Sequence, residues 1–199
     1  PAANLFQDPA AAPVAFRQDG GADGLVVMEA ENFDANVSQG GKTWSAYTAT
    51  AGYSGARALR ALTNTGVNND AGYAANSPRL DFRVNFVRTG IHYVWVRGLG
   101  LTGNDDSVHV GLDGLAVASA DRISSFPASS YGWTRSTMDG VVATINVTTP
   151  GLHTVNLWMR EDGTVVDKLL LTTSASYTPT GTGPAESPRS GAPPAVFAR

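Results

Sequence analysis

The sequence of 199 residues has no cysteine and few charges. Without cysteine, neither a disulfide framework nor a thiolate metal site can form. Charged residues make up 16% of the chain, its formal net charge is −3, and it has no basic patch, so nucleic acid is not an expected partner. No apolar run approaches the roughly 18 residues of a membrane span. A basic stretch followed by an apolar core is also absent, and we expect any signal peptide to have been removed.

Helical periodicity is missing as well. No window longer than one or two turns repeats apolar residues about every 3.6 positions. The 22 glycines and 11 prolines suit many turns between short strands. We predict strands at residues 25–33, 47–50, 56–62, 80–87, 92–98, 107–112, 115–119, 141–147, 153–159 and 165–172. This pattern predicts an all-β fold, a β-sandwich of the jelly-roll type.

Composition divides the chain into three parts. Residues 1–24 are rich in alanine, proline and glycine, and we expect a non-regular N-terminal arm or linker there. Residues 25–173 contain the predicted strands and form the expected sandwich. Residues 174–199 are rich in proline, glycine, serine and threonine. Such a composition is typical of an extended tether between modules.

An acidic pair lies in the apolar run LVVMEAENF. Residues i and i+2 of a strand share a face, so Glu29 and Glu31 would lie about 7 Å apart on one side. Two like charges on a half-apolar face are costly unless a cation lies between them. Asp167, in the apolar strand VVDKLLLTT, is a candidate third ligand. Carboxylates supplemented by backbone carbonyls suit calcium, and the alternative is a solvated edge-strand face.

The strands HYVWVRG and HTVNLWMR each separate an aliphatic face from a face of aromatic and polar groups. If both lie in one sheet with SVHVGL, the outer face forms an aromatic platform of Trp95, Trp158, Arg97, Arg160, Asn156 and His109. Pyranose faces pack on aromatic rings, and arginine adds affinity for a carboxylate or sulfate. In the alternative, the N-terminal arm covers the tryptophans and acidic residues pair with the arginines.

Two loops carry acidic residues that hairpin topology places at one end of the sandwich. GLGLTGNDD contains Asp105 and Asp106, and REDGT contains Glu161 and Asp162. Short acidic loops commonly reflect turn chemistry and solvation. In the functional alternative, these side chains bond sugar hydroxyls or hold a second calcium.

Six motifs occur in an order known from one group of proteins. They are VMEAENF, AGYAANSPRLDFRVNFVRTGIHYVWVRG, DSVHVGLDG, YGWTRS, GLHTVNLWMREDG and VVDKLLLTT. Over roughly residues 25–173, the chain resembles carbohydrate-binding modules of families 6 and 35 and their calcium-binding β-sandwich relatives. The trailing TPTGTGPAES is similar to linkers that follow such modules in secreted, multidomain polysaccharide-degrading enzymes.

The resemblance implies a structural calcium site. Glu29 and Glu31 match the calcium-ligand strand of these families, and Asp167 matches the ligand in their final strand. Backbone carbonyls of the turn 54–57 would complete the set. This calcium joins the first strand to the last and does not touch the sugar.

The resemblance also implies a sugar site at the loop end. Tyr73 and Trp133 match two loop aromatics that sandwich a sugar ring in these families. Relatives often carry asparagine two residues before the final-strand aspartate, whereas this chain has Val165. The departure shifts the polar role to Asp162 or Glu161.

Catalysis by this chain alone is not expected. Glu29 and Glu31 project in parallel from one strand and cannot flank a glycosidic bond from opposite sides. Asp106, Ser107 and His109 are residue types of a catalytic triad, but adjacent strand residues point to opposite faces. No P-loop, dinucleotide fingerprint, nucleophile elbow or zinc-protease motif occurs.

The sequence therefore predicts a secreted bacterial, non-catalytic carbohydrate-binding module with one structural calcium. It would act as a monomer tethered to a catalytic domain and target a polysaccharide-degrading enzyme to a neutral or acidic polysaccharide. The alternative is a calcium-stapled scaffold or adhesion domain. Open aromatic surfaces would favour sugar binding, and covered ones would favour the scaffold.

Overall fold

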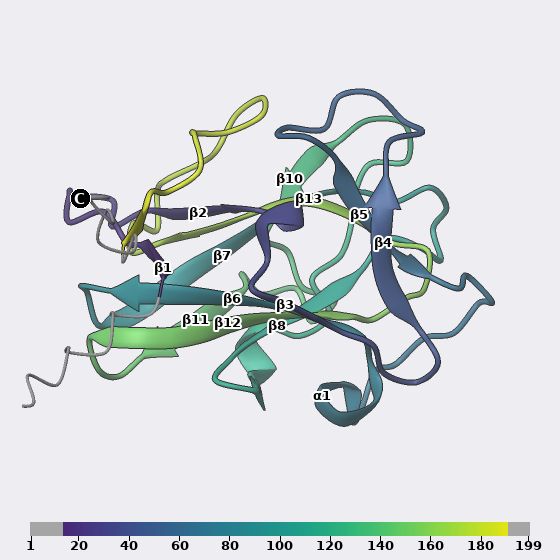
Figure 1. The fold of residues 1–199 in the computed structure, drawn as a ribbon, viewed down its shortest axis with the longest axis horizontal. Coiled ribbons are helices and arrows are strands. Elements are labelled where there is room, and N and C mark those ends of the chain that lie inside the picture. Colours follow the sequence, from purple (N-terminus) through teal and green to yellow (C-terminus); the bar gives the residue numbers. More distant parts are fainter. Residues whose placement is uncertain (1–13, 191–199) are drawn as a thin grey trace, which may run out of the picture.

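A computed structural model describes residues 14–190, which form two packed β-sheets (Figure 1). The predicted all-β sandwich is confirmed. The only helical elements among the described residues are one turn of α-helix, α1 (Tyr73–Asn76), and the 3₁₀ turns Ala30–Asn32 and Ala118–Ala120. In this part of the chain, no helix is long and apolar enough to cross a membrane.

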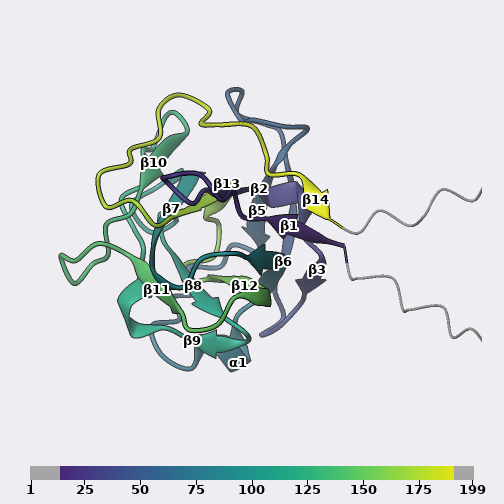
Figure 2. The same ribbon diagram turned by 90° about the vertical axis from the view of Figure 1, so that its left-hand side faces the viewer.

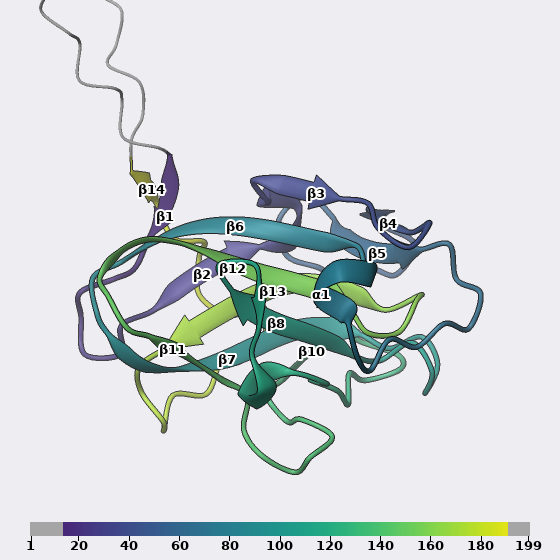
Figure 3. The same ribbon diagram turned by 90° about the horizontal axis from the view of Figure 1, so that it is seen from below.

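The first sheet has seven strands. Its order is β14 (Arg189–Ser190), β1 (Ala15–Arg17), β6 (Arg79–Phe86), β12 (Gly151–Met159), β8 (Val108–Leu112) and β9 (Leu115–Ala116), with β3 (Ala35–Val37) also paired to β6. All pairs are antiparallel except β1 with β6. The helix α1 lies against β9 and β12 on the outside of this sheet (Figure 3).

The second sheet also has seven strands. Its order is β10 (Gly132–Thr134), β7 (Gly90–Leu99), β13 (Val165–Thr172), β5 (Ala58–Leu62) and β4 (Thr43–Tyr47), with β11 (Thr144–Val147) paired to β7 and β2 (Val26–Glu29) paired to β13. The first strand of the predicted sandwich, β2, therefore lies directly beside the last, β13.

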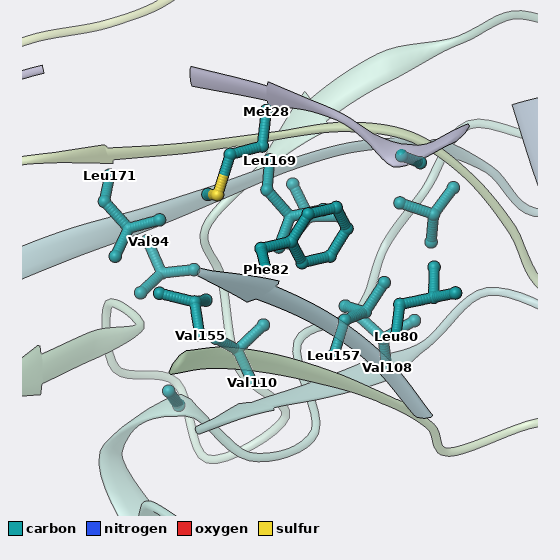
Figure 4. Packing of buried hydrophobic residues seen from close by; sticks show 14 of the residues in the cluster. Met28, Leu80, Phe82, Val94, Val108, Val110, Val155, Leu157, Leu169 and Leu171 are labelled. Atoms are coloured by element: carbon teal, nitrogen blue, oxygen red, sulfur yellow. The ribbon is translucent and has the colours of Figure 1, made fainter. Parts of the chain in front are cut away.

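The core lies between the sheets and follows from period-two alternation. Alternate residues of β6 are fully or almost fully buried and pack against aliphatic rows from β7, β8, β12 and β13 (Figure 4). Phe82 has no exposed surface and lies in the middle of this packing, close to Leu169 and Val155 in the view of Figure 4. The aliphatic faces assigned from the sequence to β7 and β12 are the core faces.

The terminal segments differ from the expected arm and tether. β1 pairs with β6, and β14 pairs with β1 at the same sheet edge (Figure 2). Between β13 and β14 the chain returns across the outside of the second sheet, where the amide of Ser187 donates to Val27 O at 2.9 Å. Tyr177 packs there against a cluster of buried residues. Composition indicated a tether because turn-forming residues give no periodic signal. Residues 1–13 and 191–199 lie outside the described residues.

Replacing Phe82 with alanine should destabilise the domain by about 3–5 kcal/mol, because the lost ring leaves a cavity between the sheets. Urea unfolding followed by tryptophan fluorescence measures the change. Val87→Ala is the control, since that side chain is 53% exposed and its loss should cost less than about 0.5 kcal/mol. Equal effects of the two substitutions would contradict the assignment of the core.

Candidate functional site

The aromatic platform expected from the strand faces does not form. Trp95 and Arg97 lie on β7 of the second sheet, whereas Trp158 on β12 and the adjoining Arg160 belong to the first sheet. None of the four is more than 8% exposed. The alternation of aliphatic and polar residues correctly placed these four side chains on outer faces. It does not show which of the two sheets a strand joins.

Trp158 and Tyr73 are covered by one another and by His109. The rings of Tyr73 and His109 stack with centroids 3.7 Å apart, and Trp158 meets Tyr73 edge-on. Burial lowers the pKa of His109 to about 4, so the ring is neutral. Its Nδ1 accepts from the amide of Arg122, and Nε2 donates to Asn69 O. Tyr73 thus has a packing role.

Trp95 and Trp133 are covered by other parts of the second sheet's outer layer. Trp95 lies in a cluster of buried residues, and the Arg135 guanidinium lies over its ring at 4.6 Å. Trp133 is half-buried and its indole donates to Gly181 O at 3.1 Å. Since Tyr73 lies on the first sheet and Trp133 on the second, the structure does not bring them together around one ligand.

The acidic loops do meet at one end of the sandwich. Asp162 is fully buried and accepts from Lys42 Nζ at 2.6 Å and from the backbone amides of residues 65–67. Burial alone would raise the pKa of Asp162, but the hydrogen bonds from Lys42 and Thr65 bring it below its usual value. Asp162 therefore holds the loop after β5 in place.

Three more carboxyls lie beside this loop. Asp105 accepts from Asn64 Nδ2 at 3.2 Å. Glu161 accepts from the Asp106 amide, from Ser107 Oγ and from Arg160 Nη1, at 2.7–3.0 Å. Burial, with the nearby charge of Glu161 as the second cause, raises the pKa of Asp106 to about 6. Arg160 also contacts Asp70, so this predicted binding arginine is used within the fold.

A tyrosine cluster that the sequence analysis missed lies next to these loops. It consists of Tyr47, Tyr53 and Tyr131, which surround the buried Val165 on the outside of the second sheet. The rings of Tyr53 and Tyr131 meet edge-on at 6.4 Å. Figure 1 shows the β4–β5 loop, which carries Tyr53, beside the segment leading into β10. Tyr47 and Tyr53 are only partly buried.

Cationic side chains accompany this cluster. The Arg60 guanidinium lies 5.8 Å from the centre of the Tyr47 ring, and Arg97 lies 5.3 Å from that of Tyr131. Two signals in the sequence pointed here. Tyr131 belongs to the same YGW motif as Trp133, and Val165 stands where relatives carry a sugar-binding asparagine.

The predicted metal ligands Glu29, Glu31 and Asp167 converge on the turn 54–57. Ser54 donates its amide to Asp167 at 2.7 Å and its hydroxyl to Glu29 at 2.6 Å. Glu31 Oε1 accepts the amides of residues 56 and 57. The structure thus brings together the three acidic residues and the turn that the sequence analysis grouped. The expected position of both glutamates on one strand is wrong, because β2 ends at Glu29 and Glu31 lies in the 3₁₀ turn Ala30–Asn32.

Two cations lie among these carboxylates. Lys168 Nζ is 2.8 Å from Glu29 Oε1, and Arg97 Nη1 is 2.5 Å from Asp167 Oδ2. No group of three or more histidine, cysteine, aspartate or glutamate side chains within residues 14–190 is arranged to hold a metal ion. Calcium binding by Glu29, Glu31 and Asp167 stays a prediction, but the donor set as arranged does not fit it. We call these five residues the charge cluster.

Several solved structures similar to this chain are carbohydrate-binding modules or contain them. A GH26-CBM35 β-(1,4)-mannanase from Podospora anserina matches with a TM-score of 0.52 and 22% identity, over 78% of this chain and 29% of that one. A CBM35 from Paenibacillus barcinonensis (TM-score 0.51, 17% identity) and the C-terminal CBM6 of the laminarinase LamC from Zobellia galactanivorans (0.50, 14%) each match over 75% of this chain and 99% of their own. At these identities the likeness shows the fold, and it confirms at that level the resemblance to families 6 and 35.

Sequence comparison identifies the family. Protein P23 of Formosa agariphila, which has no assigned function, is 34% identical over 113 residues. The match spans 53% of this chain and only 27% of that protein. The family model of the glycosyl hydrolase family 115 C-terminal domain matches residues 21–186, which is most of the sequence. The chain therefore belongs to the family of glycosyl hydrolase family 115 C-terminal domains.

Proposed function

We propose that this chain is a non-catalytic carbohydrate-binding module and that it binds polysaccharide at the tyrosine cluster. The observation that carries the proposal is a group of three tyrosine rings at the loop end around Val165, of which Tyr47 and Tyr53 are partly exposed. The two aromatic surfaces expected from the sequence are covered, so this cluster is the aromatic surface best suited to a ligand among the described residues.

The chemistry of the cluster suits a sugar. Tyrosine rings offer an apolar face to pyranose C–H groups and a hydroxyl to the sugar's own hydroxyls. Asn64 beside the neighbouring acidic loops is exposed, donates to Asp105 and adds planar hydrogen-bonding groups. Arg60 contributes a guanidinium that also suits the carboxylate of an acidic polysaccharide. Val165, which replaces the asparagine of the relatives, is fully buried beneath the tyrosine rings and supports them.

The arrangement of carboxyls favours a binding role over catalysis. A glycosidase holds two carboxyls about 5–9.5 Å apart across the scissile bond. Here Asp106 and Glu161 hydrogen-bond to each other, and Glu29 is neutralised by Lys168. Asp162 is fully buried and is bonded to Lys42 and to the loop after β5. None of these groups faces another across a space for substrate.

The family and the structural neighbours support a place for this module within a polysaccharide-degrading enzyme. The family is named for the C-terminal domain of a glycosyl hydrolase, and two neighbours carry such modules on a mannanase and a laminarinase. We therefore propose that the module is extracellular and directs a polysaccharide-degrading enzyme to its glycan. Tethering would raise a weak intrinsic affinity by increasing the local concentration of sites.

One observation favours a second function, a scaffold that positions neighbouring domains. The rings of Trp95, Trp158 and Tyr73 are buried, and the chain between β13 and β14 covers Trp133. A protein with few exposed aromatics is what the scaffold alternative requires. Binding to polysaccharide separates the two functions.

Titration calorimetry against neutral and acidic polysaccharides should detect binding. Tyr53→Ala should weaken it about tenfold or more, because a ring stacked on the sugar is a dominant contact. Tyr93→Ala is the matched control. Tyr93 is also half-buried on the second sheet but lies six residues before Leu99 on β7, about 20 Å away by strand rise.

Two results would count against this proposal. If the folded wild-type protein binds none of the polysaccharides, the scaffold becomes the better function. If it binds but Tyr53→Ala and Tyr93→Ala behave alike, the binding site lies away from the tyrosine cluster.

Stability should fall as the pH rises from about 4 to about 6 through the contribution of Asp106. Its folded pKa of about 6 exceeds the ordinary 3.8, so folding favours the protonated form and that gain is lost on ionisation. Asp106→Asn should flatten this part of the stability–pH curve measured by urea unfolding. A curve of unchanged slope in the variant would show that Asp106 is ionised normally in the folded protein.

A further inference from the structure

The charge cluster spans three neighbouring strands. Lys168 on β13 lies opposite Glu29 on β2 and, on its other side, opposite Arg97 on β7. The pairing of β13 with β7 shifts register between Val166 and Lys168, which leaves Asp167 as an extra residue. Such a bulge lets two consecutive side chains reach one side of the sheet. Asp167 and Lys168 can therefore both enter the cluster.

These charges are removed from water. Asp167 has no exposed surface, and Lys168, Arg97 and Glu29 are 2%, 5% and 7% exposed. Buried ions are retained only when they are paired and hydrogen-bonded. Each of the two cations faces a carboxylate at 2.8 Å or less.

The three carboxylates have little capacity left for a metal. Five of their six oxygens already accept hydrogen bonds or ion pairs from Ser54, the amides of residues 56 and 57, Arg97 and Lys168. Only Glu31 Oε2 is buried without a partner. Calcium takes six to eight oxygens. The turn 54–57, which was expected to add carbonyl oxygens, instead directs the amides of residues 54, 56 and 57 at these carboxylates.

The same cations also hold the chain that follows β13. Lys168 Nζ donates to the carbonyls of Thr182 and Pro184, at 2.9 and 3.2 Å. Arg97 Nε donates to Gly181 O at 3.1 Å, and Glu186 Oε1 accepts the Glu29 amide at 2.9 Å. Lys168 and Arg97 thus each bind a carboxylate and, at the same time, carbonyls of the chain that follows β13.

We propose that Arg97 and Lys168 take the place of the calcium ion of the related modules, so that this domain folds and stays closed without metal. The two side chains join the first strand of the sandwich to the last and fasten residues 181–186 across them. This inference does not depend on sugar binding.

A metal-free thermal unfolding experiment tests the proposal directly. Wild-type protein is dialysed against a chelator and its Tm is measured with the chelator and with millimolar calcium chloride. We expect the two Tm values to agree within about 1 °C, because a ligand that does not bind the native state does not stabilise it. A calcium-dependent rise of several degrees, or a saturable calorimetric signal for calcium, would overturn the proposal.

Substitutions test whether Lys168 and Arg97 stabilise the fold by neutralising the carboxylates. Lys168→Met and Arg97→Met should each lower Tm by about 6–15 °C, because each leaves a buried carboxylate without its partner. Arg83→Met is the matched control, since Arg83 pairs with Asp34 but its side chain is 41% exposed. The control should change Tm by no more than about 3 °C.

Amide hydrogen exchange detects local opening in a variant that remains folded. The Glu29 amide donates to Glu186, and the Ser187 amide donates to Val27, so both hydrogen bonds fix residues 174–190 to β2. In Lys168→Met, these two amides should exchange faster than amides of β6. Effects of Lys168→Met no larger than those of Arg83→Met, in both Tm and exchange, would contradict the assigned role. If neither variant folds, the calcium titration of the wild type still decides the proposal.

Discussion

A row of buried charges across β2, β13 and β7 joins the beginning of the domain to its end. Lys168 lies between Glu29 and Arg97, and Arg97 in turn holds Asp167. Removing any one of these partners would leave an unpaired ion in a place that water does not reach, which is among the costliest single changes a fold can suffer. The same charged residues hold residues 181–184 on the outside of the second sheet.

The charge cluster and the proposed sugar site share a residue and a loop. Arg97 pairs with Asp167, donates to Gly52 O at 3.0 Å and lies over the Tyr131 ring. Ser54, two residues after Gly52, is bonded to both Asp167 and Glu29. The β4–β5 loop that presents Tyr53 is therefore held from below by the cluster. In this fold the group that closes the sandwich also positions the loop we propose to bind sugar.

The sequence analysis succeeded where a signal is local and failed where it depends on which strands become neighbours. Alternation correctly placed Trp95 and Trp158 on outer faces, yet the two belong to different sheets. The tyrosine cluster draws residues from β4, the β4–β5 loop and the chain before β10, with no common spacing to reveal them. The 174–190 segment carries no periodic pattern because backbone and side-chain hydrogen bonds, and not a row of apolar residues, fix it to the sheet.

By itself, the sequence determined the all-β class and the core faces of the strands, and the resemblance of its motifs grouped Glu29, Glu31 and Asp167 with one turn. These depend on a two-residue period and on short motifs that each strand carries alone. Only the tertiary structure decided what neutralises those carboxylates and which aromatics remain accessible. Both are set by strand neighbours and by a bulge beside Asp167, and so by contacts between segments far apart in the chain, which no local pattern records.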